Sequence, residues 1–262
     1  MKKTITLLTV LLILVSLIAC NNGGTSGVKI PSLSGYTAAD LSGESYNIGS
    51  ATLPTTNEAT LTLFSNAFSA LSGSMNKEGA SPSYRNYSGF IGARADQTQT
   101  IDLGALFEQF GFLDGSGMSN FIWLLTITAP DSGKWADAKS ELSYDYNSDE
   151  EVPCTLAPDW VKGKVKQLVQ MHITNPNTAN ETIEMAVACS YAIACKIDGK
   201  GAKFILNIGL TGSITNDNLV VNHGSNGTLI VYNNAGVEQH RYTITDDDLA
   251  EFIFDSGYGD NN

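Results

Sequence analysis

The sequence has few charged residues and lacks an apolar run long enough to form a transmembrane helix. Lys, Arg, Asp and Glu make up 16% of the 262 residues, against roughly a quarter in average globular proteins. The longest apolar stretch, residues 5–19, falls short of the ~20 residues that a helix needs to cross a bilayer. Hydrophobic residues nevertheless make up 42% of the chain. This balance argues against a permanent membrane span and suits an exported, folded, strand-rich domain.

Basic residues are scarce as well. Lys and Arg number 15 against 27 Asp and Glu, which gives a formal net charge of -12. A surface this acidic is repelled by nucleic-acid phosphates and by anionic lipid headgroups. We therefore expect no nucleic-acid partner, and attachment to a membrane would have to come from an anchor rather than from a basic face.

Familiar catalytic signatures are missing from the sequence. It contains no Gly-x-Ser-x-Gly nucleophile elbow, no Walker phosphate loop and no His-Glu-x-x-His zinc motif. The three histidines, His172, His223 and His240, lack the close spacing of a zinc site. The sequence therefore assigns no catalytic residue and leans away from an enzyme. An exported hydrolase that uses carboxylates stays as an alternative, because the pairing of acids cannot be read from spacing.

Cysteine is also rare: beyond Cys20 only Cys154, Cys189 and Cys195 remain. On a regular strand the last two would lie ~20 Å apart, whereas a disulfide needs Cα atoms within ~7 Å. A disulfide would therefore join Cys154 to Cys189 or to Cys195. The alternative is that all three are small buried side chains.

The N-terminus has the three regions of an export signal. Lys2 and Lys3 precede the apolar residues 5–19, and the segment ends in Leu17-Ile18-Ala19-Cys20. This ending resembles the lipobox of bacterial lipoproteins. The alternatives are an ordinary signal cleaved elsewhere and an uncleaved anchor.

The resemblance to bacterial lipoproteins covers residues 1–20 alone and implies a location. Cys20 would carry the lipid, palmitate included, and become the first residue of the mature protein. Several acyl chains hold a protein durably at a membrane. Asn21 favours the outer membrane over the inner membrane. The domains expected are a signal peptide (1–19), a lipidated flexible tether (20–35) and one globular domain (36–262).

Helical periodicity occurs in three places. Apolar residues recur at spacings of three and four between Asn57 and Gly73, and again between Asp102 and Gly111. Residues 245–253 resemble a short helix that begins with a capping box.

Alternation of apolar and polar residues dominates the second half of the chain. The strongest case is residues 183–197, where bulky residues occupy the odd positions and mostly alanine the even ones. We expect a bent or bulged strand with its bulky face in a core and its alanine face closely covered. The seven predicted strands lie near residues 121–128, 169–174, 183–197, 204–210, 219–221, 228–232 and 237–244, and residues 131–160 are expected to form a long acidic loop.

The predicted fold class is therefore α+β. A helical N-terminal third precedes a largely antiparallel β-meander of about six or seven strands, and a short helix ends the chain.

One acidic segment has the spacing of calcium ligands. Asp145, Asn147, Asp149 and Glu151 alternate as oxygen ligands do at the start of a calcium loop. The EF-hand pattern stops there, because its sixth position is Glu150 rather than Gly. We expect no obligatory cofactor, and a looser calcium site stays as a hypothesis beside a solvated acidic loop.

Aromatic residues are the remaining candidates for ligand contact, against ordinary packing. They form two groups, Tyr84, Tyr87 and Phe90 with Arg85, and Trp135, Tyr144, Tyr146 and Trp160. The function expected is a non-enzymatic surface lipoprotein whose loops or sheet face bind a ligand or partner. A structural or assembly component of the envelope is the alternative.

Overall fold

The structure is a computed structural model. It describes residues 28–73, 97–111, 113–129, 134–148, 160–175, 181–215, 218–222 and 227–245.

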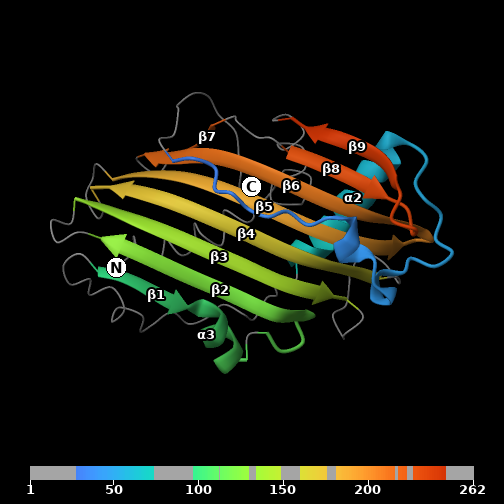
Figure 1. The fold of residues 1–262 in the computed structure, drawn as a ribbon, viewed down its shortest axis with the longest axis horizontal. Helices are drawn as coiled ribbons and strands as arrows, with labels where there is room; N and C mark the ends of the chain where they lie inside the picture. Colours follow the sequence, from blue (N-terminus) through green and yellow to red (C-terminus); the bar gives the residue numbers. More distant parts are fainter. Residues whose placement is uncertain are drawn as a thin grey trace, which may run out of the picture.

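One antiparallel sheet of nine strands dominates the molecule (Figure 1). Its order is β1-β2-β3-β4-β5-β6-β8-β9, and β7 pairs with β6 beside β8. The strands are β1 (Gln97–Asp102), β2 (Met118–Ala129), β3 (Trp135–Asn147), β4 (Trp160–Thr174), β5 (Thr182–Ile197), β6 (Lys200–Thr215), β7 (Asn218–Asn222), β8 (Gly227–Tyr232) and β9 (Glu238–Ile244). From β1 to β6 the strands are neighbours in chain order, whereas β7 and β8 each pair with β6. The sheet is antiparallel, as expected, but it has nine strands in place of the six or seven predicted.

The predicted helical N-terminal third is wrong. Before β1 the described chain has one α-helix, α2 (Asn57–Gly73), and two single 3₁₀ turns, η1 (Ala38–Leu41) and η2 (Glu44–Tyr46). The helix α3 (Leu103–Gln109) follows β1, and the Asp102 side chain caps it by accepting from the Ala105 N–H at 2.9 Å. Both helices begin and end close to where their apolar periodicity predicted. The helix expected at residues 245–253 lies outside the described residues, apart from Thr245.

Two strands were missed. β3 lies within the expected acidic loop, because its inward residues Ala136, Ala138 and Ser140 are small and give a weak apolar signal. β1 has a single apolar residue and pairs with β2 as an edge strand, where Thr98 and Thr128 join their hydroxyls at 3.0 Å.

The alternation of β5 gives the sheet two different faces. The odd residues from Ile183 to Ile197 belong to the main core, while Ala192 and Ala194 are buried on the opposite side. β5 pairs without a bulge with both neighbours over its whole length, so of the two alternatives, a bent or a bulged strand, the bulge is absent. The alanine face is closely covered, as predicted.

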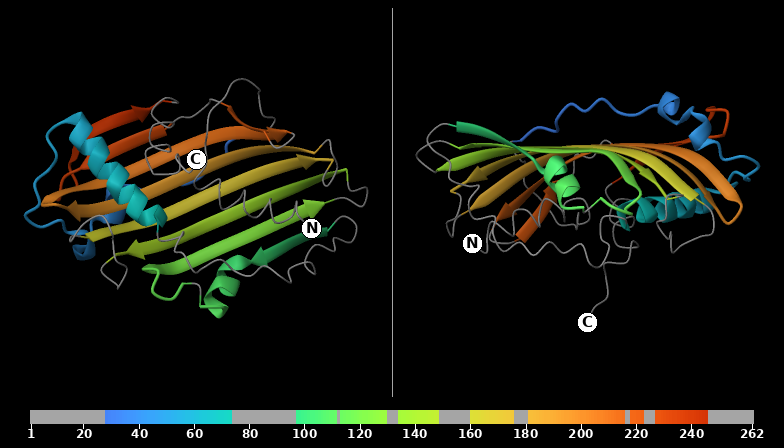
Figure 2. Two further views of the ribbon diagram at one scale, coloured as in Figure 1. Left: turned by 180° about the vertical axis from the view of Figure 1, so that it is seen from behind. Right: turned by 90° about the horizontal axis from the view of Figure 1, so that it is seen from below.

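The sheet is curved, and α2 crosses one end of its concave face (Figure 2). The ring of Phe64 meets Phe204 edge-on at 5.4 Å, and that of Phe68 meets Tyr191 at 5.2 Å. A Cβ at Gly163 would lie 2.8 Å from Leu71 Cδ1, so a larger residue at this position would force the Leu71 side chain to shift. None of the helices within the described ranges is long and apolar enough to cross a membrane.

Residues 28–52 form an extended strap on the outer, convex face of the sheet (Figure 2). The Tyr36 N–H donates to Ser190 Oγ at 2.8 Å, and Lys166 Nζ donates to the Ser34 carbonyl at 2.8 Å. A Cβ at Gly209 would lie 2.7 Å from Ile30 Cγ2. On β5, Ala192 and Ala194 pack with Leu41 of the strap, so small residues lie beneath the strap on both strands.

Lys203 fastens the far end of the strap. This side chain is 4% exposed, and its ammonium group donates to the carbonyls of Leu41 at 2.8 Å and Asn234 at 3.2 Å. Beyond it, Thr52 pairs with the β5–β6 turn through its N–H and its carbonyl. Residues 30–35, assigned to the tether from sequence, thus already contact the sheet.

Candidate functional site

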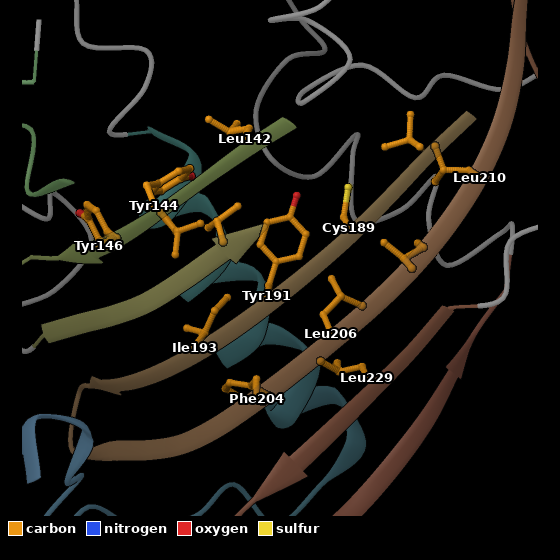
Figure 3. Packing of buried hydrophobic residues seen from close by; sticks show 14 of the residues in the cluster. Leu142, Tyr144, Tyr146, Cys189, Tyr191, Ile193, Phe204, Leu206, Leu210 and Leu229 are labelled. Atoms are coloured by element: carbon orange, nitrogen blue, oxygen red, sulfur yellow. The ribbon is translucent and has the colours of Figure 1, made fainter. Parts of the chain in front are cut away.

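Polar side chains gather at the centre of the otherwise apolar concave face. Tyr144 comes from β3, Gln167 from β4, and Cys189 and Tyr191 from β5, and we call these four the polar cluster. Figure 3 shows Tyr144, Cys189 and Tyr191 projecting among the core leucines. All four are buried, with 3–9% of each residue exposed.

The register of the strands brings the four residues of the polar cluster together. Gln167 pairs directly with Cys189, and the neighbouring residue on the same face, Val165, pairs with both Tyr144 and Tyr191. The cluster therefore spans two adjacent rows on three central strands. Phe68 of α2 packs on Tyr191, and the next row, at Cys189, lies farther from the helix contact at Gly163.

Apolar residues surround the cluster on the same face. Leu142 pairs with Gln167, and Leu206 pairs with Tyr191. The ring of Phe121 stacks on Tyr144 at 6.0 Å. The rows farther from α2 include Val187 and Met185, which are equally buried. The site thus has a polar centre and long apolar flanks.

Cys189 links two other members of the polar cluster through hydrogen bonds. Its thiol shares hydrogen bonds with Tyr191 and Gln167, which lower its pKa, but burial outweighs them and raises that pKa to about 11. Burial also raises the pKa of the Tyr191 and Tyr144 hydroxyls well above their ordinary value. All three groups are therefore neutral near pH 7 and act as hydrogen-bond donors or acceptors without charge.

Tyr144 differs from the rest of the cluster. Its hydroxyl has no hydrogen-bond partner among the residues that the structure describes, although the residue is only 3% exposed. A buried polar group without a partner costs about 1–3 kcal/mol, and most buried hydroxyls are paired for that reason. Gln167, with Cys189 as its partner, keeps a further N–H and its carbonyl oxygen available.

Charge is confined to the other face of the central strands. Within the described ranges, no Lys, Arg, Asp or Glu projects inward from β3, β4 or β5. On the outer face, Lys162, Lys164 and Lys166 of β4 lie over the rings of Trp160, Tyr46 and Tyr36. Because Tyr36 and Tyr46 belong to the strap, Lys166 and Lys164 hold the strap to the sheet. Although the chain as a whole is acidic, the outer face of β4 therefore carries a local row of three lysines.

Two of the four candidate calcium ligands lie in a strand, where a loop was expected. Asp145 and Asn147 lie inside β3 rather than in a loop, and they pair with Lys164 and Lys162 of β4. Asp145 accepts a hydrogen bond from Asn120 Nδ2 at 2.7 Å. Asp149 and Glu151 lie outside the described residues, and no cluster of three or more acidic, histidine or cysteine ligands occurs within them. Neighbouring lysines disfavour a cation at Asp145 and Asn147.

The structure describes two of the cysteines. Cys189 and Cys195 are both free and buried, which agrees with the alternative of small buried side chains for these two. Burial raises the pKa of Cys195 to about 12. Cys154 and the lipid attachment residue Cys20 lie outside the described residues.

The predicted aromatic group is dispersed over both faces. Tyr144 and Tyr146 are buried in the core, whereas Trp160 lies on the outer face. Trp135 stacks on His172, whose Nδ1 shares a hydrogen bond with Asp137 Oδ1 at 2.7 Å. Tyr84, Tyr87, Phe90 and Arg85 lie outside the described residues.

Sequence reasoning missed three members of the polar cluster as ligand contacts, Gln167, Cys189 and Tyr191, of which Tyr191 was considered only as a bulky residue of the strand at 183–197. Gln167 interrupts the alternating apolar residues of β4 two positions before Val169, and that interruption was the signal that could have found it. Cys189 was considered only as a disulfide partner or a buried apolar side chain.

Comparison with known proteins gives no name to this arrangement: no family model, no curated protein and no solved structure matches the chain.

Proposed function

We propose that this protein is an exported, lipid-anchored protein of the bacterial cell envelope that binds an amphiphilic ligand on the concave face of its sheet without transforming it. The single observation that carries the ligand site is the Tyr144 hydroxyl, which is buried and has no partner within the described residues. Long apolar flanks with a few convergent polar groups are typical of small-molecule sites.

The anchor rests on the sequence of the first twenty residues, and the strap is consistent with it. Seven residues, 21–27, separate Cys20 from Val28, where the described chain begins. Even fully extended, eight steps of the chain reach ~28 Å. Lipid at Cys20 would therefore hold the sheet close to the membrane surface, and the outer membrane is favoured by Asn21.

A neutral fluorescent probe tests the ligand site. N-phenyl-1-naphthylamine is titrated into the mature protein, residues 20–262, produced without lipid. We expect a saturable rise in fluorescence at one probe per protein and a higher melting temperature. A signal that never saturates, together with an unchanged melting temperature, would rule out this site.

Intact-mass analysis of the protein from its native membrane tests the anchor separately. The expected mass is that of residues 20–262 plus a diacylglycerol group and usually one further acyl chain. Cys20→Ser is the matched control and should remain unmodified. An unmodified N-terminus in the native protein would overturn the anchor and leave the ligand site standing.

A further inference from the structure

The two edge strands of the sheet, β1 and β9, lie at its opposite margins (Figure 1) and differ in how they are protected. β9 carries Glu238, His240 and Arg241, and the Arg241 guanidinium forms an ion pair with Glu238 at 2.8 Å. Its register with β8 also shifts, so that Gln239 has no residue opposite it. Charged side chains and bulges are usual means by which proteins keep an edge strand from pairing with another chain. The β9 margin is therefore protected.

β1 has neither form of protection over residues 97–101. These residues include no charged residue and no proline, and the register of β1 with β2 runs from Gln97 to Asp102 without a shift. Thr98, Gln99 and Thr100 are exposed. Within the part of the chain that the structure describes, no strand pairs with the outer margin of β1. A regular, accessible strand edge of this kind can accept a further strand.

The threonines of β1 suit a second copy of the same strand. On the outer face of the sheet, the hydroxyls of Thr98 and Thr128 lie 3.0 Å apart, as do those of Thr100 and Thr126. Residues directly opposite each other in an antiparallel pair lie on the same face. A two-fold register centred on Gln99 would therefore place Thr98 opposite Thr100 of the second copy. The hydroxyl rows that join β1 to β2 would then continue from one copy into the other.

The lack of charge on β1 also favours an identical partner. Pairing a strand with its own copy brings its charges close to their duplicates, and like charges directly opposite each other are destabilising. Residues 97–101 have no charge to duplicate. A different protein that recognises its partner through charge would find no charged side chain on this segment. The edge is therefore better matched to itself than to a charged partner.

We infer that β1 is a self-association edge, through which two copies of the chain pair antiparallel over residues 97–101 about a two-fold axis at Gln99. The sheets of the two copies would then form one continuous sheet. Because the contact covers a short strand, it is smaller than a standard protein interface, and we expect a dissociation constant of about 10–100 µM. The inference goes beyond the proposed function, since neither the ligand nor the lipid anchor takes part in the contact.

Sedimentation equilibrium tests whether the dimer forms. The sample is the mature protein, residues 20–262, with a reductant present so that Cys20 cannot link two copies. We expect a reversible equilibrium between monomer and dimer, with a dissociation constant in the range given above. A protein that stays monomeric up to about 1 mM would overturn the inference and leave the proposed ligand site untouched.

Charge exchange at Gln99 tests where the copies meet. Gln99→Lys and Gln99→Glu should each weaken the dimer by about three- to tenfold, because each places two like charges opposite each other. An equimolar mixture of the two variants should associate at least as tightly as the wild-type protein, since opposite charges then meet. Because Gln99 is exposed, both variants should keep the wild-type melting temperature.

The matched control is Gln239→Lys, the same change at an exposed residue of β9, which should leave the dissociation constant unchanged. Wild-type affinity in both Gln99 variants, or loss of the dimer in Gln239→Lys, would place the contact elsewhere and overturn the assignment to β1. A mixture of the two Gln99 variants that associates no better than either alone would overturn the register centred on Gln99.

Discussion

Both faces of the sheet are buried, but they differ in how many polar side chains they carry and in whether these have described hydrogen-bond partners. On the outer face, polar groups beneath the strap are paired: Ser190 bonds the Tyr36 N–H and the Asn207 side chain, and Lys203 bonds two carbonyls. On the concave face, nearly all side chains are apolar, and Tyr144 is left without a described partner. This difference supports the proposal that one face holds the strap while the other binds the ligand.

Alkaline unfolding should produce the largest effect and should come from the concave face. Cys189 and Cys195 have pKa values raised by burial to about 11 and about 12, against 9.0 for an ordinary thiol. The stability that these two thiols contribute is therefore complete below pH 9 and is lost as the pH rises through 11 and 12.

Urea unfolding between pH 8 and pH 11 measures this loss. The double variant Cys189→Ala, Cys195→Ala should lose stability less steeply from pH 9 upward. Identical slopes for the variant and the wild-type protein would show that the thiols are not buried.

The prediction from sequence succeeded where one face of an element is uniformly bulky. Residues 183–197 alternate because β5 separates the core from the alanine face, and α2 has its apolar stripe between Asn57 and Gly73. It failed for β3, where Ala136, Ala138 and Ser140 are small and acidic residues alternate with them.

The strap and the site depend on contacts that sequence spacing does not reveal. Tyr36 meets Ser190 at a separation of 154 residues. Tyr144 was named as a candidate aromatic, but its burial without a partner among the described residues follows only from the packing of three strands. Such features depend on tertiary structure, so propensity and periodicity cannot locate them.

Truncating a core side chain on the concave face should have the next largest effect on the free energy of unfolding. Phe204 is 0% exposed and packs edge-on against Phe64 at 5.4 Å. Phe204→Ala should lower the free energy of unfolding by about 3–5 kcal/mol, because it leaves a cavity between β6 and α2. Val237→Ala, at a residue that is 56% exposed, should change it by less than about 0.5 kcal/mol. Chemical denaturation measures both, and similar losses would contradict the assigned core.

Releasing the strap should have an intermediate effect on the outer face. Lys203→Met removes the donor from the carbonyls of Leu41 and Asn234. Hydrogen bonds to a charged group contribute about 1.5–3 kcal/mol, so a loss of this size is expected, with faster proteolysis at residues 38–46.

Lys196→Met is the control for strap release, since Lys196 lies on the same face and is half-buried. A Lys203→Met protein with unchanged stability and unchanged cleavage would mean that Lys203 does not hold the strap.

An exposed ion pair on the outer face should have the smallest effect. His172 and Asp137 lie 2.7 Å apart with side chains 39% and 55% exposed. Asp137→Asn should change the free energy of unfolding by about 0–1 kcal/mol, because solvent screens such pairs. Thermal unfolding at low and high salt measures it, and a loss above about 2 kcal/mol would place His172 in a far less solvated site.

The most direct test of the binding face is a crystal structure of the mature protein with N-phenyl-1-naphthylamine. The account predicts that the probe lies on the concave face in contact with Tyr144. A probe bound elsewhere or not at all, with the Tyr144 hydroxyl bonded to the protein's own chain, would contradict it.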